Sequence, residues 1–108
     1  MVRFGIQAPH EQINPTDLLN DVIMMERYGI EKWWSSDHYM PWWHTGAAGG
    51  AAWPWLGAAL AKTDRIVVGT GVTAPILRYN PAVVVMSLLR LGTCSLAGSF
   101  SGLEEANR

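Results

Sequence analysis

The chain has 108 residues, enough for one modest domain with a hydrophobic core. Hydrophobic residues make up 49% and charged residues 16%, a composition that excludes a disordered chain. The net charge of −1 argues against nucleic acid or an anionic membrane as the main partner, and the single cysteine excludes an internal disulfide.

The N-terminal region does not resemble a secretion signal. Three acidic residues, Glu11, Asp17 and Asp21, come too early for one. The apolar runs are also shorter than the roughly 18–20 residues that a membrane span needs. We therefore expect a soluble protein of the cytoplasm.

The first predicted elements are a strand and a helix. Residues 2–7 (VRFGIQ) alternate apolar and polar side chains, a pattern typical of a short strand. Residues 14–30 (NPTDLLNDVIMMERYGI) have apolar residues at helical spacing. Asn14 or Thr16 can cap this helix, and Gly29 ends it where a left-handed residue is favoured.

The pattern then repeats twice. Residues 30–35 predict a second strand, which leads through a long loop into a helix over about 53–62. Residues 64–72 (DRIVVGTGV) form a continuous β-branched run, as in a strand buried on both faces of a parallel sheet. Residues 80–91 (NPAVVVMSLLRL) open a third helix, with Asn80 as its cap and proline at its first position.

The order β-α-β-α-β-α predicts an α/β fold with a parallel sheet and right-handed connections. It fits part of a doubly wound sheet or the first three units of a (β/α)8 barrel. In either architecture sites form at the carboxyl ends of the strands, and the loops after these strands carry the reactive side chains.

The most unusual stretch is WWSSDHYMPWWHTG, residues 33–46, which holds four of the six tryptophans around Asp37 and His38. The pair directly follows a strand, and the aromatic rings can form the walls of a pocket. Histidine titrates near neutral pH, which suits a general base. The alternative is a capping aspartate beside an ordinary loop histidine.

Glu11 follows the first strand, so the topology brings it toward the same edge of the sheet as His38. A lone acid in such a loop is otherwise a solvated side chain. Metal binding is not predicted, because the histidines lack ligand spacing; these are His10, His38 and His44.

Two further motifs could bind a ligand or could be ordinary loop segments. GTGV, residues 69–72, lacks the third glycine of a dinucleotide-binding fingerprint, so a nicotinamide site is not expected. Arg78 to Pro81 (RYNP) reads as a loop and a helix cap, although a basic residue beside a helix N-terminus can bind an anion.

Two blocks, SSDHYMPWWHTG and RIVVGTGVTAPILRYNPAVV, resemble the luciferase-like flavin and deazaflavin oxidoreductases. The nearest resemblance is to the group that uses coenzyme F420, the glucose-6-phosphate dehydrogenases and secondary alcohol dehydrogenases. The resemblance covers residues 1–84. It implies a (β/α)8 barrel, of which these residues would be the N-terminal three βα units, and hydride transfer between a hydroxyl-bearing carbon and the deazaflavin.

The resemblance also implies roles for individual residues. His38 would be the base that takes the hydroxyl proton, Trp42 would lie against the reacting centre, and Glu11 would help to orient this cluster. The coenzyme would be bound by Asp37, Thr70, Gly71 and Val72, the last two joined by a cis peptide bond that supports the ring.

The chain departs from the family at Gly71, where a residue with a side chain is usual, and at Ala74, where threonine is common. Two other functions remain open. One is an FMN-dependent luciferase-like monooxygenase, and the other is a non-catalytic chain that self-associates. We expect a small-molecule substrate and a homo-oligomer.

Residues 85–108 do not follow the family pattern. Codons can be chosen for Met86 to Asn107 which, read one base earlier, encode HVFATLGYMFPGRVFLGLGRGE and restore that pattern. We therefore expect an out-of-frame tail from about Val85. The restored sequence ends in the glutamate that donates a proton in the family, so we expect the chain to be inactive by itself.

Overall fold

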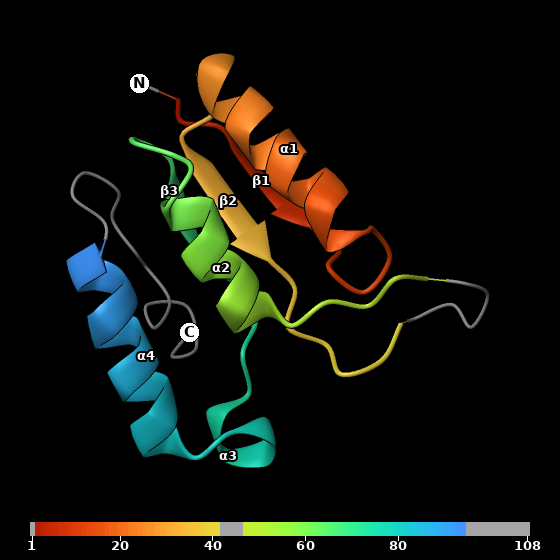
Figure 1. Ribbon diagram of the computed structural model, residues 1–108, viewed down its shortest axis with the longest axis vertical. Coiled ribbons are helices and arrows are strands. Elements are labelled where there is room, and N and C mark those ends of the chain that lie inside the picture. Colours follow the sequence, from red (N-terminus) through yellow and green to blue (C-terminus); the bar gives the residue numbers. More distant parts are fainter. Residues whose placement is uncertain (1, 42–46, 95–108) are drawn as a thin grey trace.

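The computed structural model describes residues 2–41 and 47–94 (Figure 1). Three strands alternate with helices in chain order, as the sequence predicts. The elements are β1 (Gly5–Ala8), α1 (Pro15–Arg27), β2 (Lys32–Ser35), α2 (Ala52–Leu60), β3 (Val67–Thr70), α3 (Pro75–Arg78) and α4 (Pro81–Cys94).

The strands form one parallel sheet in the order β1-β2-β3. Ile6, Trp33 and Val68 lie side by side in register on one face of this sheet, against the helices. Because side chains alternate along a strand, Gln7 and Trp34 lie on the opposite face. The predicted α/β class with a parallel sheet is confirmed.

The hydrophobic core lies between the sheet and helices α1 and α2. Leu18 and Val22 of α1 and Leu56 of α2 are at most 1% exposed. Trp33 is 2% exposed, and its ring stacks on Trp55 at 5.9 Å between centroids. Trp33 is therefore a core residue.

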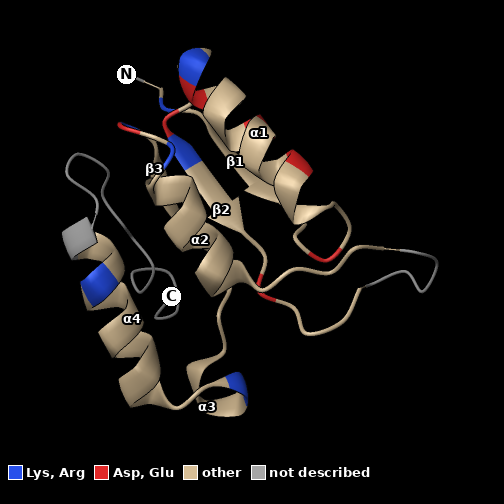
Figure 2. Cartoon of the chain, in the orientation of Figure 1, with Lys and Arg blue, Asp and Glu red and all other residues tan. Residues whose placement is uncertain are grey.

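Helix α2 carries no charged residue (Figure 2). It packs between α1 and α4, so its buried side chains face neighbours on more than one side. A helix that is apolar over most of its surface is expected in such a central position.

The caps predicted at Asn14 and Asn80 and the left-handed Gly29 are confirmed. Asn14 Oδ1 accepts from the backbone N–H of Thr16 at 2.9 Å, and Asn80 Oδ1 accepts from that of Ala82 at 2.9 Å. Gly29 has φ +85°, the left-handed conformation that glycine adopts without strain. The strand predicted over residues 2–7 instead begins at Gly5.

The entry to β3 is held by Glu26, in the last turn of α1. Its carboxylate accepts from the backbone N–H groups of Asp64, Arg65 and Ile66 at 2.7–3.1 Å. Desolvation raises the pKa of Glu26, but these amides and the Arg65 charge outweigh it, so the pKa lies below its ordinary value. The contact joins α1 to a segment 38–40 positions further along the chain.

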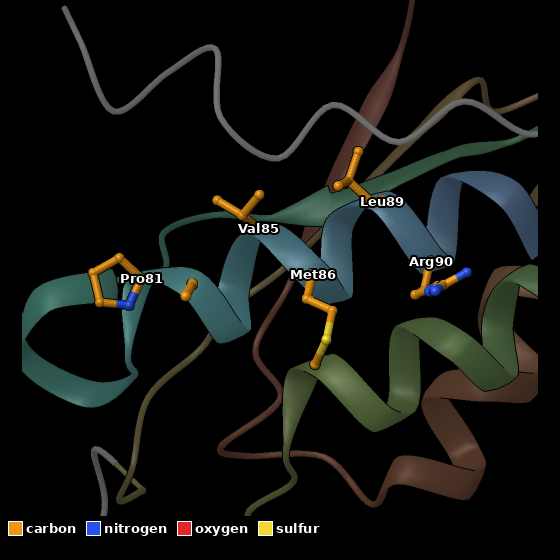
Figure 3. Close-up of a pocket in the computed structure, with 6 residues that line it drawn as sticks. Pro81, Val85, Met86, Leu89 and Arg90 are labelled. Atoms are coloured by element: carbon orange, nitrogen blue, oxygen red, sulfur yellow. The ribbon is translucent and has the colours of Figure 1, made fainter.

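The outer side of α4 carries exposed apolar side chains (Figure 3). Val85, Met86 and Leu89 are 49%, 57% and 66% exposed, and they line a cavity of about 570 Å³ together with Pro81, Ala82 and Arg90. This cavity has no acid or histidine in its lining. In residues 2–41 and 47–94, no helix is long and apolar enough to cross a lipid bilayer.

Candidate functional site

A cavity of about 430 Å³ opens at the carboxyl ends of β1 and β2. Its lining comes from the loops that follow these strands, as the parallel topology predicts. The lining residues are Gln7, Ala8, Pro9, Glu11, Gln12, Ser36 and His38.

Glu11 is a buried member of this cavity and not a solvated loop residue. Its side chain is 6% exposed, and Oε2 accepts a hydrogen bond from Ser36 Oγ. Ser36 Oγ in turn accepts from the backbone N–H of His10 at 2.7 Å. The carboxylate is thus held in place by both loops.

His38 lies beside this carboxylate. Its Nε2 is 4.0 Å from Glu11 Oε1, and its side chain is 44% exposed, so the imidazole faces both the acid and the open cavity. A carboxylate at this distance can orient the imidazole ring and balance a positive charge on it. The pair can therefore accept a proton from a group in the cavity.

Asp37, the neighbour of His38, points elsewhere. Its side chain is 1% exposed. Oδ2 accepts from Thr73 Oγ1 at 2.9 Å, while Oδ1 accepts from Tyr79 Oη at 2.9 Å and from Arg78 Nη1 at 3.1 Å. Both carboxylate oxygens are therefore bonded within the chain, and contact of Asp37 with a coenzyme stays a prediction.

Tyr79 is half-buried in this network. Burial, followed by its hydrogen bond to the Asp37 carboxylate and the charge of that group, raises the pKa of Tyr79 above 10. The nearby Arg78 charge opposes the shift without cancelling it. The phenol is thus held protonated as a donor to Asp37.

The end of β3 contributes Thr70, Gly71 and Val72. The peptide bond between Gly71 and Val72 is cis, as the resemblance implies. Gly71 O accepts from Gln7 Nε2 at 3.0 Å, which ties this segment to a cavity residue. Val72 is 65% exposed. A Cβ at Gly71 would lie 3.3 Å from Trp34 Cβ, so Trp34 leaves little room for the side chain that is usual there.

His10 is a buried histidine that the sequence did not mark as part of the site. It is 0% exposed and its ring meets that of Trp55 edge-on, with centroids 4.5 Å apart. Neither ring nitrogen has a hydrogen-bond partner in residues 2–41 and 47–94. Burial lowers the pKa of His10, and the charges of Glu11 and Asp37 oppose this only in part.

One site prediction falls on a residue that the structure does not describe. Trp42 lies in the segment 42–46, outside the described ranges, as does the histidine His44. Within those ranges no three side chains of the His, Cys, Asp and Glu types gather as a metal site would require.

The cavity residues fit a planar, hydrogen-bonding coenzyme. Gln12 lines the cavity and Thr70 ends β3, and the buried atoms Gln12 Nε2 and Thr70 Oγ1 have no hydrogen-bond partner among the described residues. Such atoms cost free energy unless a ligand or water satisfies them. Donors of this kind suit the carbonyl oxygens of a flavin or deazaflavin ring.

The parallel βα units and an acid–imidazole pair at the strand ends define an α/β protein with a site of the barrel-enzyme type. Residues 2–95 match the family model described as luciferase-like monooxygenase, and the chain belongs to this family. The F420-dependent glucose-6-phosphate dehydrogenase of Beutenbergia cavernae is 47% identical over 92 residues, 85% of this chain and 27% of that protein.

The chain is also similar to solved structures of F420-dependent enzymes. An F420-dependent secondary alcohol dehydrogenase in complex with an F420–acetone adduct aligns with a TM-score of 0.86 and 37% identity, over 93% of this chain and 30% of that one. The coenzyme F420-dependent tetrahydromethanopterin reductase of Methanopyrus kandleri aligns with a TM-score of 0.74 and 25% identity, over 92% and 26%. The chain thus spans about a quarter to a third of the length of these proteins.

Proposed function

We propose that this chain carries the proton-accepting half of an F420-dependent dehydrogenase site. The observation that carries the proposal is the pair of Glu11 and His38, 4.0 Å apart in a cavity at the strand ends. The family membership and the names of its relatives support F420 as the coenzyme and give no support to FMN.

In this proposal the substrate is a small molecule with a secondary hydroxyl group. His38 accepts the hydroxyl proton while the adjacent C–H bond breaks and a carbonyl forms. Glu11 orients the imidazole and balances the charge that His38 acquires. F420, when bound, supplies the hydride acceptor.

The coenzyme would be held by the residues around the cavity and at the end of β3. Gln12 and Thr70 would contribute the polar atoms that have no partner within the described part of the chain, and Gly71 and Val72 would contribute backbone. Trp42 is proposed to lie against the substrate. Sugar phosphate and secondary alcohol both remain candidate substrates, because the relatives are named for one or the other.

We also propose that the chain does not catalyse the reaction by itself. The barrel of such enzymes has eight strands, and the described part of this chain has three. The proton-donating glutamate that the resemblance implies falls in residues 85–108, which we propose to be out of frame. Sequencing the gene tests this: codons incompatible with the second reading frame would refute it.

Two further proposals concern the setting of the protein. The single cysteine supports a cytoplasmic location. The apolar side of α4, together with a net charge of only −1, supports association with a second copy of the chain.

Coenzyme titration is the first test. We expect the 108-residue chain to bind F420 and not FMN, measured by quenching of its tryptophan emission. Gln12→Leu, which removes an unpartnered donor, should weaken F420 binding. Asn20→Leu is the control, since Asn20 is exposed on α1 and away from the cavity lining. Binding of FMN alone, or of neither compound, would contradict the coenzyme assignment.

Catalysis is tested in a hybrid enzyme. Residues 2–84 of this chain would replace the matching segment of the Beutenbergia cavernae relative. We expect F420 reduction with glucose 6-phosphate or a secondary alcohol, and a loss of about 10²- to 10⁴-fold in kcat for His38→Ala. A hybrid that binds F420 and keeps its full rate after His38→Ala would rule out the proposed role.

A further inference from the structure

The segment after β3 carries an arginine to which neither the family match nor the relatives' names give a role. Arg78 ends the one-turn helix α3 and precedes the cap of α4. Its place beside a helix N-terminus suggested an anion-binding residue. In the structure the anionic group that it binds is the carboxylate of Asp37.

Arg78 contacts Asp37 at both its backbone carbonyl and its carboxylate. Its Nη1 donates to the backbone carbonyl oxygen of Asp37 and lies 3.1 Å from Oδ1 of the same residue. The guanidinium also lies 5.3 Å from the centroid of the Tyr79 ring, and the Tyr79 hydroxyl donates to Asp37 Oδ1 as well. One side chain thus binds both the backbone and the side chain of its partner.

Arg78 itself is firmly placed. Its side chain is 26% exposed, and its backbone N–H donates to Ala74 O at 3.1 Å within α3. The next amide, that of Tyr79, donates to Pro75 O at 3.1 Å. The short helix therefore fixes the base from which the guanidinium reaches the loop after β2.

The carbonyl that Arg78 holds belongs to the peptide unit that leads into His38. The Asp37 C=O and the His38 N–H lie in one rigid plane, so fixing the oxygen fixes the direction in which the His38 backbone starts. Among the described residues, the other side chains that bond to Asp37 are Thr73 and Tyr79, which belong to the same segment as Arg78.

We propose that Arg78 is the positioning residue of the site: by holding the peptide unit between residues 37 and 38, it keeps the His38 imidazole against Glu11. This inference rests on the proposed function, because the orientation of His38 matters for catalysis only if His38 accepts the substrate proton. Arg78 touches neither Glu11 nor the cavity, so it acts through Asp37 alone.

The test uses the full 108-residue chain and the ring signals of its histidines in proton–carbon NMR spectra. Arg78→Gln is expected to move the His38 signal to the position of an unstructured histidine. The signal of His10, which is buried in the core, is expected to stay in place and reports that the fold is intact. Arg78→Lys, which keeps the charge, should restore part of the His38 shift.

A double-mutant comparison separates positioning from general loosening. If Arg78 acts by holding His38 against Glu11, Arg78→Gln in a Glu11→Gln background should move the His38 signal much less than it does in the native chain. Arg3→Gln is the control, because Arg3 pairs with Glu31 at the surface, 71% exposed, and should leave His38 unchanged.

The outcomes are distinguishable from those of the proposed function. An unchanged His38 signal in Arg78→Gln, or equal movement with and without Glu11, would overturn the positioning role even if F420 binds. Failure of the native chain to bind F420 would overturn the proposed function, while the His38 signal would still report on Arg78. In the hybrid enzyme we expect Arg78→Gln to lower kcat by about 10- to 100-fold with little change in F420 affinity.

Discussion

At the scale of single residues, the sequence neighbours Asp37 and His38 have different surroundings: one side chain is buried and the other is exposed. His38 faces an open cavity beside a carboxylate, whereas the Asp37 side chain is 1% exposed and bonded on both oxygens. Removing one partner of a buried charge is costly, because the other is left without compensation. Asp37 therefore stabilises the site region through its own network.

This network predicts the ionisation of Tyr79. In Asp37→Asn the negative charge is lost, so the pKa of Tyr79 should fall back toward 10. The measurement is an absorbance titration at alkaline pH in a background of Tyr28→Phe and Tyr39→Phe, which leaves one tyrosine. If Tyr79 has the same pKa in Asp37→Asn as in the protein with Asp37, the carboxylate does not affect the ionisation of the phenol.

The buried imidazole of His10 predicts a pH dependence of stability. Its folded-state pKa lies below 6.5, so the unfolded chain binds the proton more readily in the window below that value. Stability should therefore rise with pH across this window and be lost as the pH falls below about 6.5. The charges of Glu11 and Asp37 reduce the effect without reversing it.

Thermal unfolding between pH 5 and 8 measures this dependence. His10→Phe keeps an aromatic ring against Trp55 and should flatten the profile below pH 6.5. His38→Asn is the matched control, since His38 is exposed and should leave the contribution of His10 in place. A profile that is equally steep in His10→Phe would assign the acid sensitivity to other groups.

At the scale of the elements, local patterns predicted most of the helices and strands. The caps at Asn14 and Asn80 and the left-handed Gly29 were identified because each is decided by a few neighbouring residues. The predicted start of β1 is too early. Pairing between the two strands begins at Gly5, which lies opposite Lys32, the first residue of β2. Helix α3 was missed because a single turn of four residues leaves no periodic signal.

The candidate site was predictable only where topology alone brings residues together. Parallel strands place their carboxyl ends at one edge, which was enough to join Glu11 and His38. The bonds from Thr73 and Tyr79 to Asp37 span 36 and 42 positions and depend on how a loop folds back. No local pattern encodes such a contact, so the resemblance assigned Asp37 to the coenzyme alone.

Glu26 gives a prediction at this scale. Glu26→Gln removes the negative charge that accepts three backbone amides, and we expect a loss of about 1 kcal/mol in unfolding free energy, reduced by solvent exposure of the contact. Because the folded-state pKa is lowered, the same stabilisation should disappear in the native chain as the pH falls below about 4.5.

Urea unfolding at pH 7 and pH 3 checks both statements. Glu31→Gln is the control, because its ion pair with Arg3 is exposed and contributes little. If Glu26→Gln is as stable as the native chain at pH 7, the amide contacts do not hold the entry to β3.

At the scale of the whole molecule, the proposal that a second copy of the chain covers the apolar side of α4 can be tested by mutation. Leu89→Glu places a charge among Val85 and Met86 and should shift the chain toward the monomer. Sedimentation velocity measures the change. Leu77→Glu is the control, since Leu77 is 88% exposed on α3 and outside this cavity.

Two results would contradict self-association through α4. One is a native chain that is already monomeric at high concentration. The other is an oligomer that survives Leu89→Glu but is dispersed by Leu77→Glu.

The reach of Glu26 has a consequence for the integrity of the molecule. Strands β1 and β3 do not pair with each other, yet the helix that follows β1 holds the amides that open β3. The first βα unit is therefore bonded directly to the third, although the second unit lies between them in the sequence. The amide protons of Arg65 and Ile66 should consequently exchange with solvent only when the last turn of α1 opens, so that the three units lose their structure together.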